Sequence, residues 1–78
     1  MITADAIRRC AYLSTSQLED VLRKTYPKDK ILLSTFLGVT NGGQFTYDCT
    51  YFDDIEGENQ RCKVFVYIDS TNTIVADY

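Results

Sequence analysis

Apolar side chains recur with a helical period in the first third of the chain and indicate two short helices. The first stripe predicts a helix over residues 4–13, capped by Thr3, and consists of Ile7, Cys10 and Ala11. The second predicts a helix over residues 16–26 and consists of Leu18, Val21, Leu22 and Tyr26. Pro27 disfavours helical geometry at the residue before it, so the second helix should end there. Capping-box spacing at its start is met twice, by Ser14 with Gln17 and by Ser16 with Glu19.

From residue 31 the hydrophobic period changes to two, which predicts four strands at residues 31–40, 44–53, 61–69 and 73–78. A two-residue turn at Asn41-Gly42 would mix apolar and polar rows in the first hairpin. A three-residue loop with Gly43 in the left-handed conformation instead puts one apolar row on one face, namely Ile31, Leu33, Leu37, Val39, Phe45, Tyr47, Cys49 and Tyr51. We adopt this second register. The same loop form with Asn72 left-handed aligns Ile68 with Ile74 and Val66 with Ala76.

Helices that precede all the strands predict an α+β fold, with two N-terminal helices packed on one face of a four-stranded antiparallel meander sheet. Residues 1–78 would form one domain. The predicted core is Ile7, Cys10, Leu18, Val21, Leu22, Leu33, Leu37, Val39, Phe45, Tyr47, Cys49, Val64, Val66 and Ile68. The register of the loop at residues 54–60 stays open, so Cys49 and Cys62 are either directly paired or diagonal.

The opposite face of this sheet is the candidate binding surface, because both helices are committed to the first face. Its predicted members are Leu32, Phe36, Asp48, Phe52, Lys63, Phe65, Tyr67, Val75 and Asp77. Large exposed apolar patches usually mark a partner site. A homodimer that buries the patch, and cross-strand pairs that only stabilise the sheet, are the alternatives. The edge strands at residues 31–40 and 73–78 offer strand addition as a further mode.

Charge is distributed unevenly along this chain of 78 residues, whose formal net charge is −3. Residues 1–43 carry +2 and residues 44–78 carry −5. The acidic half predicts a protein partner with a basic surface, although the same charge would also serve solubility. The negative net charge disfavours a nucleic-acid partner. The two helices nevertheless also resemble a DNA-binding helix-turn-helix, whose phosphate contacts would be Arg23, Lys24, Lys28 and Lys30.

Catalytic and metal-binding constellations are scarce, so we predict no enzyme and no cofactor. The chain has no histidine, and its three cysteines, Cys10, Cys49 and Cys62, form no CxxC pair. We predict that they are reduced thiols in a reducing compartment. Four carboxylates surround Gly57 but lack EF-hand spacing, so no metal is expected: Asp53, Asp54, Glu56 and Glu58. No window approaches the roughly 20 apolar residues of a membrane span, and residues 1–5 lack the features of a secretion signal, which predicts a soluble cytoplasmic protein.

Residues 16–78 resemble a PepSY-type module, a layout similar to β-lactamase-inhibitor-like domains. The resemblance rests on the helix end Thr25-Tyr26-Pro27-Lys28-Asp29-Lys30-Ile31, on Gly43-Gln44-Phe45-Thr46-Tyr47-Asp48, and on Val64-Phe65-Val66-Tyr67-Ile68-Asp69 followed by a turn and Ile74-Val75. The usual Thr-Gly of the last turn is Thr71-Asn72 here. The resemblance implies an inhibitory, protein-binding role in protease propeptides or the cell envelope, which requires a secretion signal that has been removed.

Together these features predict a non-catalytic protein-binding module, most simply a small inhibitor that blocks a partner's functional surface. Its aromatic contacts would be Phe36, Phe52, Phe65 and Tyr67, and its acidic contacts Asp48, Asp53, Asp54, Glu56, Glu58 and Asp77. In size, acidity and lack of chemistry it resembles the inhibitors with which phages and mobile elements block host defence nucleases in the host cytoplasm, such as anti-CRISPR proteins. A small nucleic-acid-binding regulator that uses the basic helical half is the alternative.

Overall fold

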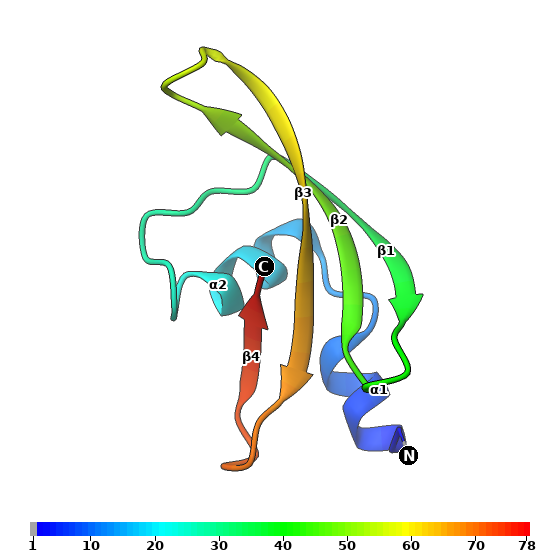
Figure 1. Cartoon of the computed structure of the whole chain (residues 1–78). Coiled ribbons are helices and arrows are strands. Elements are labelled where there is room, and N and C mark those ends of the chain that lie inside the picture. Colours follow the sequence, from blue (N-terminus) through cyan, green and yellow to red (C-terminus); the bar gives the residue numbers. More distant parts are fainter. Residues whose placement is uncertain (1) are drawn as a thin grey trace.

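The computed structural model describes residues 2–78 and shows two short helices followed by a four-stranded antiparallel sheet (Figure 1). The predicted α+β class is therefore confirmed. The strands follow one another in the sheet in chain order. The elements are α1 (Ala4–Cys10), α2 (Thr15–Leu22), β1 (Leu33–Val39), β2 (Phe45–Asp53), β3 (Glu58–Ile68) and β4 (Ile74–Asp77).

Both helices begin at predicted caps and end earlier than predicted. The Thr3 hydroxyl accepts a hydrogen bond from Ala6 N, and Ser14, not Ser16, forms the capping box, with Gln17. Helix α1 ends at Cys10 because the backbone is extended at Ala11 and left-handed at Tyr12, with φ 59°. After α2 the chain continues in tight turns toward Pro27, so the α-helical hydrogen bonds stop before the proline is reached.

The first hairpin has the predicted loop, but the register of β1 against β2 differs from the prediction beyond Val39. Gly43 is left-handed, with φ +83°, and Val39 lies opposite Phe45 as expected. Beyond that point a β-bulge at Gly38, with φ +141°, shifts the register and leaves Leu37 without a partner residue. One extra residue reverses the face of every side chain that follows it along the strand.

The bulge overturns several predictions about β1. Phe36, predicted on the outer face, pairs with Tyr47 and turns inward, with its ring centroid 5.2 Å from that of Tyr47. Leu33 and Leu37, predicted in the core, are 61% and 53% exposed. Val39 is also exposed because it lies on an edge strand near the turn, and Ile7 is exposed because α1 buries Cys10 instead.

The core lies between the helices and the inner face of the sheet. Figure 1 shows both helices on the same side of the strands. Their buried residues join those of the strands in one cluster, whose larger members are Leu18, Leu22, Ile31, Phe45, Tyr47, Cys49, Val64 and Val66. Val21 and Ile68, predicted in the core, are partly buried against this cluster.

The two later hairpins resolve the remaining registers. Asn72 is left-handed, with φ 63°, and aligns Ile68 with Ile74 and Val66 with Ala76, as predicted. In the β2–β3 hairpin Cys49 and Cys62 lie directly opposite each other, and both thiols are free.

The β2–β3 hairpin extends past its neighbours as a two-stranded arm. Strand β1 pairs with β2 only as far as Thr50, and β4 pairs with β3 only over Phe65–Ile68. We call residues 51–60 the hairpin arm; it forms the upper end of the sheet in Figure 1. The arm makes the molecule elongated, with principal extents of 41 × 22 × 19 Å.

Candidate protein-interaction surface

The face of the sheet that points away from the helices carries six of the nine residues predicted for it, namely Asp48, Lys63, Phe65, Tyr67, Val75 and Asp77. Strand pairing places Thr46 beside Phe65, Asp48 beside Lys63, and Tyr67 beside Val75 on this face. We call it the open face; its members are Leu33, Thr35, Thr46, Asp48, Thr50, Arg61, Lys63, Phe65, Tyr67, Val75 and Asp77. Leu33 and Thr35 were not predicted here, and a glycine inside a strand pattern, Gly38, was the signal for the bulge that exposes them.

The aromatic side chains of the open face are half-buried. Phe65 lies on β3 between Thr46 of β2 and Asp77 of β4, and Tyr67 lies beside Val75 of β4. Thr46, between Gly38 and Phe65, is only 9% exposed. The apolar area available to a partner is therefore shared between these rings and the exposed Leu33 and Leu37.

Two of the predicted acidic contacts are already engaged within the chain. Asp48 forms an ion pair with Arg61, and this carboxylate raises the pKa of the guanidinium. Asp77 Oδ1 accepts a hydrogen bond of 2.5 Å from the Tyr26 hydroxyl, which raises the pKa of Tyr26. This bond ties the segment after α2 to the edge strand β4. The carboxylates of Asp48 and Asp77 are therefore less available for contacts with a partner than the sequence indicates.

The four other predicted carboxylates gather at the end of the hairpin arm. Asp53 shapes the turn by accepting hydrogen bonds from the backbone N–H groups of Ile55 and Glu56. Within residues 2–78, Asp53, Asp54, Glu56 and Glu58 form no ion pair. Two large apolar side chains accompany them: Phe52 is exposed, and Ile55 is 94% exposed. The arm thus presents unpaired negative charge beside apolar surface.

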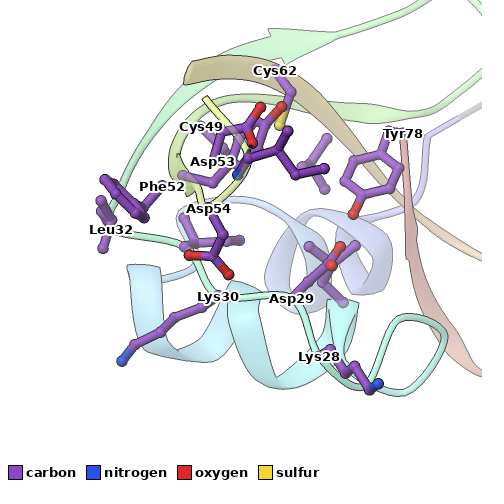
Figure 2. A pocket seen from close by; sticks show the side chains of 15 residues that line it. Lys28, Asp29, Lys30, Leu32, Cys49, Phe52, Asp53, Asp54, Cys62 and Tyr78 are labelled. Carbon is purple, nitrogen blue, oxygen red and sulfur yellow. Dashed lines mark hydrogen bonds between the residues drawn. The ribbon is translucent and has the colours of Figure 1, made fainter. Parts of the chain in front are cut away.

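A cleft of about 870 Å³ lies beside the arm, and sequence reasoning missed it (Figure 2). The inner residues of the arm form one wall, and the chain between α2 and β1 forms the other. The cleft exists because α2 ends at Leu22 and lies beside β4, so neither helix covers the inner side of the arm. Its apolar lining includes Leu22, Ile31, Tyr51, Phe52, Val64 and Tyr78.

One carboxylate atom at the cleft has no partner. Asp29 Oδ2 is buried and accepts no hydrogen bond from any residue of the described chain. Figure 2 shows the Asp29 carboxylate pointing toward the interior of the cleft, whereas Lys28 and Lys30 extend away from it. A buried carboxylate oxygen without a donor is costly, so the cleft favours a ligand that brings one.

The cysteines are poor candidates for chemistry. Burial, reinforced by the neighbouring Cys62, raises the pKa of Cys49 to about 12. Burial also raises the pKa of Cys10 and of Cys62. These thiols stay protonated at neutral pH, and the thiolate is the form that attacks electrophiles and binds metals. Among the described residues, no three His, Cys, Asp or Glu side chains are grouped to hold a metal ion.

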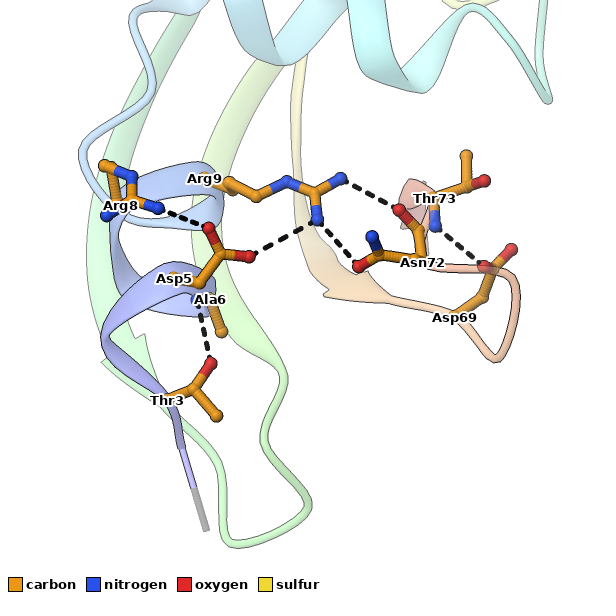
Figure 3. Close-up of polar contacts among 8 residues, drawn as sticks. All are labelled: Thr3, Asp5, Ala6, Arg8, Arg9, Asp69, Asn72 and Thr73. Carbon is orange, nitrogen blue, oxygen red and sulfur yellow. Dashed lines mark hydrogen bonds and ion pairs between the residues drawn. The ribbon is translucent and has the colours of Figure 1, made fainter.

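The three arginines of the basic half are engaged in contacts within the chain. Arg9 donates hydrogen bonds to the side chain and the carbonyl of Asn72, which ties α1 to the β3–β4 turn (Figure 3). Arg8 and Arg9 also pair with Asp5. Arg23 lies beyond the end of α2, where its Nε donates to the carbonyl of Pro27. These arginines are less available to phosphates than the sequence indicates.

Fold and surface together define a small α+β domain with an open antiparallel sheet face and an acidic hairpin arm. No family model, curated protein or solved structure matches the chain. The resemblance to PepSY-type modules therefore rests on the sequence features quoted above. No helix within residues 2–78 has the length and apolar character needed to cross a membrane.

Proposed function

We propose that the chain is a non-catalytic protein-binding module that inhibits its partner by covering a functional surface. The observation that carries the proposal is the hairpin arm, which projects beyond the helices. Its four carboxylates form no ion pair within residues 2–78, and Phe52 and Ile55 are exposed. Exposed apolar side chains beside unpaired charge are typical of a binding site, because exposed apolar surface costs solubility and these side chains contribute little to the core.

The proposed contact surface combines the arm with the open face. The arm would meet the cations of a basic partner surface, and Leu33, Leu37, Phe65 and Tyr67 would supply apolar contact. Phe36 is not part of this surface because the bulge turns it inward. Blocking requires only that the complex cover residues the partner needs, so no chemistry of the inhibitor is involved.

Small size and negative charge make a nucleic-acid-handling protein the natural target. Such a target carries a basic surface for phosphates, and an acidic arm would occupy it. An inhibitor of a host defence nuclease encoded by a phage or mobile element, such as an anti-CRISPR protein, fits this chemistry and would act in the host cytoplasm. The chain's own eight basic residues argue against mimicry of a whole DNA duplex.

The proposal is tested by capture of the partner from source-cell lysate, followed by an activity assay of the purified partner. The wild-type chain should bind with defined stoichiometry and inhibit. Reversing two arm charges, with Asp54→Lys and Glu56→Lys, should abolish both effects without altering the melting temperature, because both side chains are exposed. The matched control compares Asp54→Lys alone with Asp20→Lys, since Asp20 is an exposed carboxylate on α2 that forms no ion pair within residues 2–78. Equal loss from the control would refute the arm as the contact.

The alternatives give different outcomes in simple solution experiments. A nucleic-acid binder would be retained on DNA with a strong salt dependence that disappears with Arg23→Ala and Lys24→Ala. A homodimer that buries the open face would sediment as a dimer and become monomeric with Leu33→Ser and Tyr67→Ser. Either result would replace the inhibitor proposal.

A further inference from the structure

Strand β3 has a neighbour on both sides over only part of its length. It pairs with β2 from Glu58 to Val66, whereas β4 covers only Phe65–Ile68. An unpaired strand edge offers a row of backbone donors and acceptors to another extended chain. On the side of β4, the segment from Glu58 to Val64 is such an edge.

The hydrogen-bond pattern identifies which residues direct their backbone groups to this edge. Asp69 N–H donates to Thr73 O over 2.9 Å, so Asp69 faces the β4 side. In an antiparallel ladder, the residues that face one neighbour recur at every second position. Continuing back along β3 beyond the end of β4, the N–H and C=O groups of Asn59, Arg61 and Lys63 face the open side. We call these three residues the free edge.

The cleft lies next to the free edge, under the inner side of β3. Cys62 and Val64 of β3 line it together with Tyr51 and Tyr78. A strand added along the free edge would project every second side chain toward this cleft, because side chains alternate between the two faces of a sheet. The Asp29 carboxylate, with its buried and unpartnered Oδ2, points into the same space (Figure 2).

The negative charge around the cleft indicates what kind of peptide strand could bind at the free edge. The hairpin arm beside the cleft carries Asp53, Asp54, Glu56 and Glu58 without ion pairs among the described residues, and Asp29 adds a fifth carboxylate. The nearby cations are directed elsewhere: Lys28 and Lys30 extend away from the cleft, Arg61 pairs with Asp48, and Lys63 lies on the open face. A cationic side chain would both neutralise this charge and donate a hydrogen bond to Asp29.

We propose that the free edge of β3 binds an extended basic peptide segment of a protein partner by strand addition, with a Lys or Arg side chain directed at Asp29. Main-chain hydrogen bonds to Asn59, Arg61 and Lys63 supply affinity, and the cleft selects alternate side chains. The five residues from Asn59 to Lys63 span about 16 Å at the usual rise of a strand, so a segment of about six residues fills the edge. This site shares Arg61 and Lys63 with the open face, but it uses their backbone groups and the cleft under the inner side of β3.

The probe is a blocked six-residue peptide in which lysine alternates with valine. In the free ¹⁵N-labelled protein, the amides of Asn59, Arg61 and Lys63 should exchange faster with solvent than those of Gln60 and Cys62, which pair with β2. Saturating peptide should slow exchange at the three free-edge amides by about tenfold or more. The same peptide N-methylated at alternate backbone nitrogens keeps its charge and should not produce this protection.

The role of Asp29 is tested with a matched pair of charge variants. Asp29→Asn should weaken binding of the lysine peptide by about tenfold, because the charged hydrogen bond is lost. Asp20→Asn removes the same charge from an exposed position on α2 and should change the affinity less than about twofold. A peptide with glutamate in place of lysine should not bind.

Three results would overturn the proposal. Equal binding of the N-methylated peptide would show attraction by charge alone. Equal effects of Asp29→Asn and Asp20→Asn would remove the cleft from the site. Protection of Asn59, Arg61 and Lys63 in the pure protein, together with sedimentation as a dimer, would show that a second copy of the chain occupies the edge. None of these three results tests whether the partner is captured through the arm charges. The strand-addition proposal can therefore be refuted while the proposed inhibition stands, and the reverse also holds.

Discussion

At the residue scale, single polar groups join segments that are far apart in the sequence. The buried Tyr47 hydroxyl donates to Cys10 O over 2.6 Å and accepts from Leu13 N over 3.0 Å. Cys10 is the last residue of α1, so its carbonyl has no partner within the helix. One phenol on β2 therefore satisfies two backbone groups at the end of α1 and in the linker to α2, and burial raises its pKa.

Removing this hydroxyl should destabilise the domain although the ring remains. Tyr47→Phe leaves Cys10 O and Leu13 N without their hydrogen bonds, which should cost about 1–3 kcal/mol. Urea denaturation followed by circular dichroism would show a lower midpoint at an unchanged slope. The control Tyr51→Phe removes the hydroxyl of a half-buried residue. That hydroxyl has no hydrogen bond to the described chain, so its loss should cost less than about 0.5 kcal/mol. Equal losses would contradict the interpretation.

Asp69 gives the β3–β4 turn a dependence on pH. Its carboxylate accepts hydrogen bonds from the Thr71 hydroxyl, from Thr73 N and from Thr71 N, which lower its pKa below the ordinary value of 3.8. Because the unfolded chain takes up the proton at higher pH than the folded one, this contribution to stability is complete above the unfolded pKa. It is lost as the pH falls through the lower pKa of the folded state.

Comparison with Asp69→Asn measures that contribution directly. The variant keeps the shape of the side chain and loses its charge, so at pH 7 it should have a lower free energy of unfolding than the wild type. The difference should shrink as the pH falls below 3.8, when the wild-type carboxylate is protonated as well. Urea titrations at a series of pH values test this. A difference that stays constant down to pH 2 would refute the assignment.

At the element scale, the β1 bulge decides which side chains reach the core. The bulge places Phe36 against Tyr47 and against Tyr12, whose ring centroid lies 5.1 Å away. It also moves Leu33 and Leu37 to the exposed side. Gly38 adopts φ +141°, a conformation that L side chains rarely adopt.

A side chain at Gly38 should therefore strain the strand. No atom lies within 4 Å of the position a Cβ would take, so the cost of Gly38→Ala is conformational, and we expect about 1–3 kcal/mol. Gly42→Ala is the matched control, since Gly42 does not have a positive φ and its Cβ would make an ordinary contact with Thr40. Thermal unfolding of both variants tests this. A Gly38→Ala melting temperature equal to that of the control would show that β1 tolerates another register.

At the scale of the whole molecule, short helices and a long hairpin leave different parts of the sheet uncovered. The helices cover the inner face near β4 and the lower ends of β2 and β3, and the open face has no helix (Figure 1). The arm extends past both edge strands and bears the unpaired acidic charge. Arg9 of the basic half holds α1 to the β3–β4 turn. The surface available to a partner is thus concentrated at the arm and the sheet beside it.

The sequence by itself determined the features that depend on near neighbours in the chain. The cap at Thr3 and the left-handed turn residues Gly43 and Asn72 follow from the local preferences of those side chains and their spacing, which also narrowed the second cap to Ser14 or Ser16. The α+β class follows from the order of helical and alternating segments. The register that places Cys49 opposite Cys62 could not be predicted from the sequence, because the loop before β3 admitted two registers.

Only the tertiary structure decided which side of β1 faces inward and where the chain leaves space. The alternation of apolar and polar residues defines two rows of side chains but does not say which row is buried. In β1 the bulge at Gly38 turned the row with Phe36 inward and the row with Leu33 outward. The cleft and the unpartnered oxygen of Asp29 depend on how far α2 and β4 extend relative to the arm. These lengths are set by packing between segments that are far apart in the sequence. A local pattern of apolar and polar residues carries no information about that packing.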